Sequence, residues 1–253
     1  MFFDSHAHYD DERFENDRSE VIKSVYDNKI TRVCNVGSDI KTSKTSIAIA
    51  EKYDFIYAAV GVHPHEVENM TDETLGIVSE MAKNKKVVAI GEIGLDYYYD
   101  NSPRDLQKKW FEAQLDMAKK LDMPCIIHTR DATEDTLSIL KNVSAKDVVI
   151  HCYSGSKETA KTILNMGYYI SFAGAVTFKN ARGILDVVKY VPDDRFFIET
   201  DCPYLTPEPN RGKRNYSVYM IDTAKKIAEI RDTTLSHIAE VTYNNASKFY
   251  RIK

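Results

Sequence analysis

Two histidines with one residue between them, His6 and His8, stand near the start of the chain. They follow a short apolar run with the composition of a β-strand. Side chains two positions apart in a strand point to the same side, so both imidazoles could reach one metal ion. On its own, the pair could equally be two surface or core histidines, and a metal site needs support from elsewhere in the chain.

Glu92 provides that support, because it is a carboxylate inside the apolar run of residues 89–96. A buried carboxylate is costly unless a cation or a metal ion compensates its charge. The basic residues closest to the expected strands are Arg32 and Lys86, and both stand at strand starts. We therefore expect a metal ion beside Glu92, and a lysine or arginine from a neighbouring strand is the alternative.

Three more candidate ligands come at the ends of other apolar runs, namely His128, His151 and Asp201. Each alone has an ordinary structural interpretation, as a satisfied histidine or as an aspartate in a turn or helix cap. Together, four histidines and two carboxylates predict a metal centre, because these groups bind Zn, Mn, Fe, Co, Ni and, with water, Mg. The predicted ligands are His6, His8, Glu92, His128, His151 and Asp201.

Six ligands exceed the three that a catalytic site with a single zinc ion uses. We therefore predict two divalent ions, with Zn, Mg, Mn and Ni as candidates and Glu92 placed to bridge them. The ions would activate water, and Asp201 could orient that water and accept its proton, so Glu92 and Asp201 are the predicted catalytic residues. Two ions and two carboxylates leave a charge of about +2, which would attract a phosphodiester.

The elements that must bring these residues together are eight short β-rich runs separated by amphipathic helical patterns. A chain of 253 residues with 43% hydrophobic residues is long enough for one α/β barrel. The helical patterns include residues 106–121, residues 221–228 and a helix over 157–166, with Ser156 as its N-cap and Gly167 after its end. The expected strands are residues 1–6, 32–36, 56–62, 87–93, 124–128, 148–152, 168–172 and 196–200.

Strands that alternate with helices predict a (β/α)8 TIM barrel with eight parallel strands, formed by a single domain over residues 1–253. In such barrels the active site lies at the carboxyl ends of the strands, where the predicted ligands stand. The net charge of −4 argues against a broad basic face that grips duplex DNA. The chain shows neither a targeting segment nor a long apolar run, so we expect a cytoplasmic protein with no membrane partner.

Six motifs surround the candidate ligands and run in order along almost the whole chain. They are DSHAH (4–8), GVHPH (61–65), GEIGLDY (91–97), HTRDA (128–132), HCYSG (151–155) and ETDCPYL (199–205), and PEPNRGKRN (207–215) follows them.

These motifs resemble the TatD family of metal-dependent deoxyribonucleases, within the amidohydrolase-like barrel group. The resemblance implies metal-dependent hydrolysis of ester bonds in DNA, including 3′ to 5′ exonuclease action on single strands or damaged ends. The sequence gives no evidence of an obligate protein partner. The resemblance also implies that His6, His8, Glu92 and Asp201 serve one metal ion and that Glu92, His128 and His151 serve the other. Family members often continue the last motif with Glu-Pro, whereas Tyr216 and Ser217 stand here, which puts fine substrate contacts in doubt.

Several residues around these motifs could contact the substrate. His63 and His65 end the third strand run and could bind phosphate or simply cap a loop. Cationic side chains suit phosphate contacts, although those after the eighth run could equally be solvated. The tyrosines at 97–99 could stack bases, and packing is their other interpretation. The predicted substrate-binding residues are His63, His65, Arg130, Arg211 and Lys213.

Two alternatives remain open from the residues alone. The same metal ligands could serve an amidase, a lactonase or a phosphotriesterase, although related barrels often bridge their metals with a carboxylated lysine where Glu92 stands here. A protein that binds metal or nucleic acid without turnover is the other alternative, and a spare acid/base such as Asp201 argues weakly against it.

Overall fold

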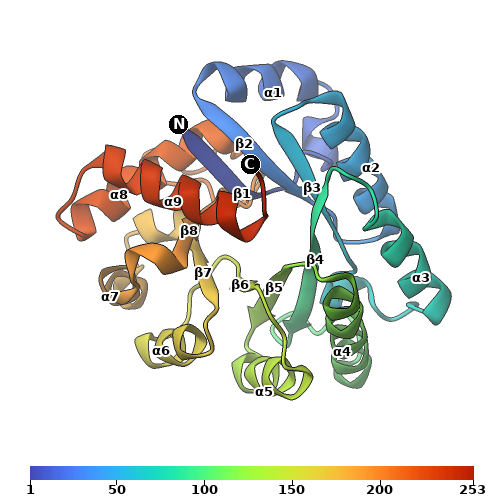
Figure 1. Cartoon of the computed structure of the whole chain (residues 1–253). Coiled ribbons are helices and arrows are strands. Elements are labelled where there is room, and N and C mark those ends of the chain that lie inside the picture. The colour runs from blue at the N-terminus through green and yellow to red at the C-terminus, as the bar shows by residue number, and fades with distance from the viewer. The chain divides into compact units, whose positions relative to one another are not determined.

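In a computed structural model that covers residues 1–253, eight strands alternate with helices (Figure 1). The strands form one sheet in the order of the sequence, and the described strand pairs are parallel. Ala7 forms a parallel bridge with Cys202, so the first and last strands meet. The predicted (β/α)8 barrel is confirmed. Its strands are β1 (Phe2–Ala7), β2 (Ile30–Val36), β3 (Ile56–Val60), β4 (Val87–Asp96), β5 (Cys125–Arg130), β6 (Val148–Ile150), β7 (Tyr169–Phe172) and β8 (Phe196–Ile198).

The helices over residues 104–121, 157–165 and 220–230 lie where the three amphipathic patterns predict helices. Ser156 accepts a hydrogen bond from the backbone N–H of Thr159 at the start of α6, and Gly167 follows that helix with a φ of 82°. The α-helices are α1 (Arg18–Asp27), α2 (Ile40–Lys52), α3 (Asp72–Met81), α4 (Arg104–Leu121), α5 (Thr133–Val143), α6 (Lys157–Asn165), α7 (Arg182–Tyr190), α8 (Met220–Ile230) and α9 (Leu235–Phe249). Short 3-10 turns are η1 (Glu12–Phe14), η2 (Pro64–Glu66), η3 (Gly174–Thr177), η4 (Asp193–Arg195) and η5 (Ser217–Tyr219).

The ends of several strands differ from the prediction. Strand β6 stops at Ile150 and β8 stops at Ile198, so the candidate ligands that follow them lie on connecting segments. The backbone leaves the β region soon after, because Cys152 and Asp201 have φ values of 46° and 55°. Strand β4 is longer than predicted and continues to Asp96.

The chain divides into two compact units, residues 1–35 with 151–253 and residues 36–150. In the first unit, α9 packs on β1 and β8, and α8 lies beside α9 (red in Figure 1). Aromatic rings fill this contact, where Phe197 lies against Tyr169 and Phe249 with ring centroids 4.9 and 5.2 Å apart. One domain over residues 1–253 stays a prediction.

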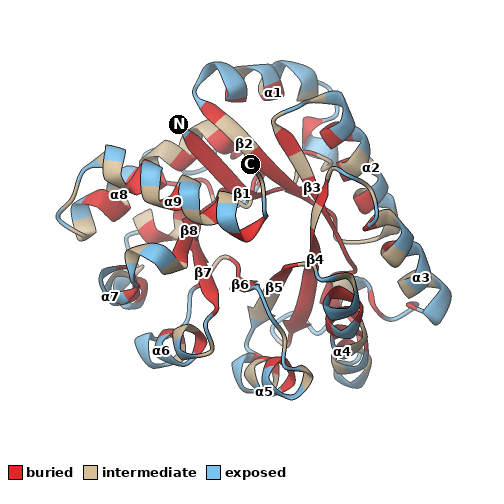
Figure 2. Ribbon diagram, in the orientation of Figure 1, coloured by how far each residue is buried: buried red, intermediate tan, exposed pale blue.

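In the second unit, α4 covers β4 and ties down the ends of two strands. Trp110, Phe111 and Leu115 of this helix are buried, and Figure 2 shows that α4 carries both buried and exposed residues. Gln114 accepts a hydrogen bond from the N–H of Val62 and donates one to its carbonyl, at 2.8 and 3.0 Å. Gln107 makes the same pair of bonds with the backbone of Asp96. These glutamines fix the backbone at the carboxyl ends of β3 and β4.

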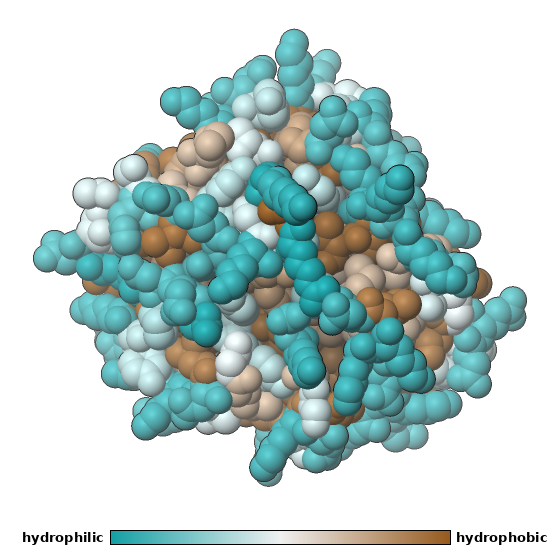
Figure 3. Space-filling model, viewed as in Figure 1, coloured by the Kyte–Doolittle hydropathy of each residue, from teal (hydrophilic) through white to brown (hydrophobic).

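Hydrophilic side chains cover most of the face seen in Figure 3, and apolar side chains show between them in small patches. None of the helices combines the length and the apolar character that crossing a bilayer requires.

Gly94 leaves no room for a side chain in β4. Its φ is +147°, and a Cβ atom would lie 1.9 Å from the carbonyl oxygen of His128 on β5. We therefore expect Gly94→Ala to lower the free energy of unfolding by about 3 kcal/mol or more, because strand β5 would have to move. Urea unfolding followed by circular dichroism measures this loss.

The matched control is Gly76→Ala in α3, where a Cβ atom meets nothing within 4 Å. Alanine favours a helix over glycine, so this variant should gain up to about 1 kcal/mol. A Gly94→Ala protein as stable as the parent would show that β4 and β5 do not pack this closely.

Candidate metal centre

The first unit brings together the two histidines of the first motif and the aspartate after β8. His6 is buried on β1, and His8 follows the end of that strand. Their Nε2 atoms lie 3.1 Å apart. One oxygen of Asp201 lies 3.3 Å from Nε2 of His8 and 3.8 Å from Nε2 of His6. The backbone N–H of Asp201 donates to the carbonyl of His6 at 2.9 Å, which holds this loop beside β1.

His151 completes this group together with a residue that the sequence prediction missed, Glu199. The ring of His151 stacks on that of His6, with centroids 4.2 Å apart and 15° between the planes. Oε1 of Glu199 lies 3.4 Å from Nδ1 of His151. The ligand atoms of His6, His151 and Glu199 lie within 4.8 Å of one another. We call these residues the β1/β8 cluster, which consists of His6, His8, His151, Glu199 and Asp201.

Glu199 is buried and held by neutral donors. The backbone N–H of Cys152 donates to Oε1 at 2.6 Å, and the hydroxyl of Ser171 donates to Oε2 at 2.5 Å. Glu199 directly follows the apolar residues of β8, and Glu92 lies among the apolar residues of β4. The argument that predicted a metal ion beside Glu92, the cost of a buried carboxylate, therefore applies equally to Glu199.

Asp201 is ionised at neutral pH. Burial works to raise the pKa of its carboxyl group, but the hydrogen bond with His8 and the charges of His6, His8 and His151 outweigh it and lower the pKa. A carboxylate in this state can bind a cation or accept a proton.

Asp4 supports the cluster from behind. Burial raises the pKa of its carboxyl group to about 6. Its oxygens accept hydrogen bonds from the N–H and hydroxyl of Thr200, at 2.9 and 2.6 Å, and from the hydroxyl of Ser217 at 2.6 Å. Asp4 is therefore a hydrogen-bond acceptor at the strand ends, and it joins β1 to the segments after β8.

The second unit holds a second group around Glu92, whose side chain is buried in β4. Oε1 of Glu92 lies 2.9 Å from Nδ1 of His128 and 3.5 Å from Nε2 of His63. The ligand atoms of these three residues lie within 4.8 Å of one another. Burial lowers the pKa of His63 to about 4, so its imidazole is neutral at pH 7 and keeps a lone pair for a cation.

Asp96, at the end of β4, is a further residue that the sequence prediction missed. Its Oδ2 lies 3.0 Å from Nε2 of His128 and 3.0 Å from Nε2 of His65. Burial works to raise the pKa of Asp96, but hydrogen bonds from His128, the Tyr99 backbone and His65 outweigh it and hold the pKa well below its usual range. The β4 cluster consists of His63, His65, Glu92, Asp96 and His128.

The remaining predicted contacts are cationic side chains at exposed positions. Arg130 ends β5, and its guanidinium lies 3.9 Å from the ring centroid of Tyr98. Arg211 lies over the ring of Phe178 and donates to the carbonyl of Thr206. Lys213 donates to the side chain of Asn210 at 2.9 Å.

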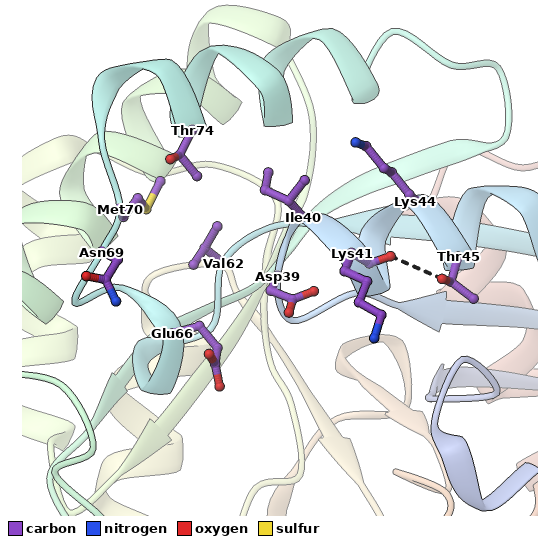
Figure 4. A pocket seen from close by; sticks show the side chains of 10 residues that line it. All are labelled: Asp39, Ile40, Lys41, Lys44, Thr45, Val62, Glu66, Asn69, Met70 and Thr74. Atoms are coloured by element: carbon purple, nitrogen blue, oxygen red, sulfur yellow. Dashed lines mark hydrogen bonds between the residues drawn. The ribbon is translucent and has the colours of Figure 1, made fainter.

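A pocket of about 550 Å³ lies next to the loop that carries His63 and His65 (Figure 4). The starts of α2 and α3 and the η2 turn surround it, with Ile40, Val62 and Met70 as apolar lining. The residues of the two clusters do not line this pocket.

The donors in both clusters fit divalent metal ions. Each cluster combines imidazole nitrogens with buried carboxylates, the ligand set that suits Zn, Mn, Ni and related ions. In each cluster a histidine ring nitrogen also faces a carboxylate, a contact that commonly orients a histidine ligand.

Comparison with known proteins agrees with this chemistry. A family model described as TatD related DNase matches residues 3–251. The metal-dependent hydrolase YabD of Bacillus subtilis (strain 168) is 47% identical over 254 residues, with both chains covered completely. The metal-dependent hydrolase YcfH of Escherichia coli (strain K12) is 34% identical, with 98% of this chain and 95% of that protein covered.

Solved structures give the same result. YjjV, a TatD homologue from Escherichia coli K12, superposes with a TM-score of 0.94 at 27% identity, over 100% of this chain and 98% of that one. The chain therefore belongs to the TatD family and is a metal-dependent hydrolase.

Proposed function

We propose that this protein hydrolyses phosphodiester bonds of DNA and removes nucleotides from the 3′ ends of single strands. The observation that carries the proposal is the pair of imidazole and carboxylate clusters, one in each unit of the chain. The DNase description of the matching family model supports DNA as the substrate. The cytoplasmic location stays a prediction of the sequence.

Two divalent ions, of Zn, Mg, Mn or Ni, are the proposed cofactors. The family resemblance assigns His6, His8, Glu92 and Asp201 to one ion and Glu92, His128 and His151 to the other. Within the first unit, Glu199 is close enough to His6 and His151 to join their ligand set, and within the second unit His63 is close enough to Glu92 and His128. Divalent ions bound by such residues would lower the pKa of water and withdraw charge from the phosphoryl oxygens.

The chain's own residues perform the remaining tasks. Asp201 is ionised and partly exposed, so it can orient the attacking water and accept its proton. Asp96 holds the ring of His128 through Nε2. Exposed cations such as Arg130 and Lys213 can bind phosphate groups of the strand, because their ammonium and guanidinium groups donate to anionic oxygens.

The decisive test is hydrolysis of a 3′-labelled single-stranded oligonucleotide with Mg²⁺, Mn²⁺ or Zn²⁺, and with EDTA in place of metal. We expect cleavage that EDTA abolishes, and a loss of about 100-fold or more in kcat for Asp201→Asn, which removes the proton acceptor. A lactone and a phosphotriester, assayed in parallel, test whether the site acts on another ester.

The matched control is Asp193→Asn. Asp193 also contacts a histidine, with 2.8 Å between its Oδ2 and Nε2 of His237, but it lies outside both clusters. This variant should keep full activity. Cleavage that persists in EDTA, preferred turnover of the lactone, or an active Asp201→Asn protein would each contradict the proposal.

Glu199 offers a separate test of metal binding. The substitution Glu199→Gln replaces the carboxylate by an amide of the same size. It weakens the interaction with His151 and the attraction for a cation. We expect metal affinity about 10- to 100-fold lower, measured by calorimetric titration of metal-free protein, with an unchanged circular dichroism spectrum. Glu158→Gln, at an exposed position on α6, is the control. Equal affinities for both variants would exclude Glu199 from the metal centre.

A further inference from the structure

Two exposed tyrosines follow β4, and the guanidinium of an arginine lies against the rings of both. Tyr98 and Tyr99 are 57% and 54% exposed, and their rings stand nearly perpendicular, with centroids 4.9 Å apart. The guanidinium carbon of Arg130 lies 3.9 Å from the Tyr98 centroid and 4.8 Å from that of Tyr99. We call Tyr98, Tyr99 and Arg130 the aromatic platform.

The backbone fixes this platform in place. Oδ1 of Asp96 accepts hydrogen bonds from the N–H groups of Tyr98 and Tyr99, at 3.0 and 2.9 Å. Arg130 stands opposite Asp96 in the β4–β5 register, and its carbonyl accepts from the N–H of Tyr97 at 2.9 Å. The backbone that carries the rings and the guanidinium is therefore held in position before any ligand arrives, which reduces the entropy cost of binding.

The platform also lies beside the β4 cluster. The ring of Tyr99 packs edge-on against that of His65, with centroids 5.4 Å apart. Asp96 joins the two groups, because one of its oxygens binds the tyrosine backbone while the other lies 3.0 Å from the ring nitrogens of both His65 and His128. A ligand on the platform would thus lie next to the residues proposed to bind metal.

The chemistry of the platform selects one kind of ligand. Tyr98 is more than half exposed, although a guanidinium already lies against its ring. A second planar group can stack on the open side. Arg130 makes no ion pair with a carboxylate, so its N–H groups can bind an anion in this acidic protein of net charge −4. A flat ring joined to a phosphate, as in a nucleotide, meets both requirements.

We propose that the aromatic platform binds an unpaired nucleobase of the substrate strand, with the base stacked on Tyr98 and the adjoining phosphate at Arg130. This inference rests on the proposed function and names the part of the strand that the protein recognises. A base within a duplex is already stacked and paired, so the platform would favour single strands over duplexes.

The test compares two single-stranded oligonucleotides that differ only in whether their last three 3′ nucleotides carry bases or are abasic. We expect the parent protein to prefer the strand with bases. Tyr98→Ala should raise KM for that strand about 5- to 150-fold with little change in kcat, and should leave KM for the abasic strand unchanged. Tyr98→Phe keeps the ring face and should retain the preference.

Tyr190→Ala is the matched control, because Tyr190 is another exposed tyrosine beside a cation, with Nζ of Lys157 5.0 Å from its ring centroid. This variant should behave like the parent protein. Equal KM values of the parent protein for the two strands, or a preference that survives in Tyr98→Ala, would overturn the platform while leaving DNA hydrolysis intact.

A binding assay separates this inference from the proposed function. Fluorescence anisotropy of the same two labelled strands, with EDTA present, reports affinity without cleavage. A preference for bases that Tyr98→Ala removes would support the platform even if the parent protein hydrolysed neither strand, an outcome that would refute the hydrolase proposal alone. Equal binding of both strands by the parent protein and by Tyr98→Ala would overturn the platform.

Discussion

The cost of burying carboxylates among apolar strands is the constraint on which the rest of this structure depends. An ionised carboxylate loses several kcal/mol of hydration when it leaves water, and only nearby donors or cations can offset that loss. Glu92 is buried in β4, and Glu199 is buried directly after the end of β8. Each faces an imidazole nitrogen, at 2.9 Å from His128 and 3.4 Å from His151 respectively. A bound cation would offset the remaining cost of burying these carboxylates, so the two clusters are best explained as a metal centre.

The surrounding structure serves to keep these costly groups in position. Asp4 accepts hydrogen bonds from both Thr200 and Ser217, and so fixes the segments on either side of the loop that carries the last predicted ligand. In the other unit, Gln107 and Gln114 of α4 bind the backbone where β3 and β4 end. Buried polar side chains that bind backbone in this way replace the hydrogen bonds that the strands lose where they leave the sheet. These hydrogen bonds hold the backbone next to both clusters.

Much of this arrangement could be predicted from the sequence, because strand composition and the spacing of ionisable residues reflect local requirements. The eight strands, the helix capped by Ser156 and the membership of the TatD family are confirmed. The ends of β6 and β8 differ from the prediction, because Cys152 and Asp201 have positive φ values that amino-acid composition does not reveal. The predicted ligands and substrate contacts stay predictions.

Other features depend on tertiary contacts that no local pattern encodes. Asp96 binds His65 and His128 because β4, β5 and the η2 turn bring these side chains together, and the sequence shows Asp96 only as the end of an apolar run. Likewise, Arg130 meets Tyr98 because of the β4–β5 register. Charge and spacing alone could not separate a stacking role for these tyrosines from simple packing.

We propose that the chain binds two divalent ions through residues of the β1/β8 and β4 clusters. Mass-spectrometric metal analysis of protein loaded with Mn²⁺ or Zn²⁺ and freed of excess metal tests it most directly, for the parent protein and for His6→Ala and His128→Ala. We expect about two ions per chain for the parent protein and about one for each variant. A parent protein that retains no metal, or variants that retain as much as the parent, would contradict it.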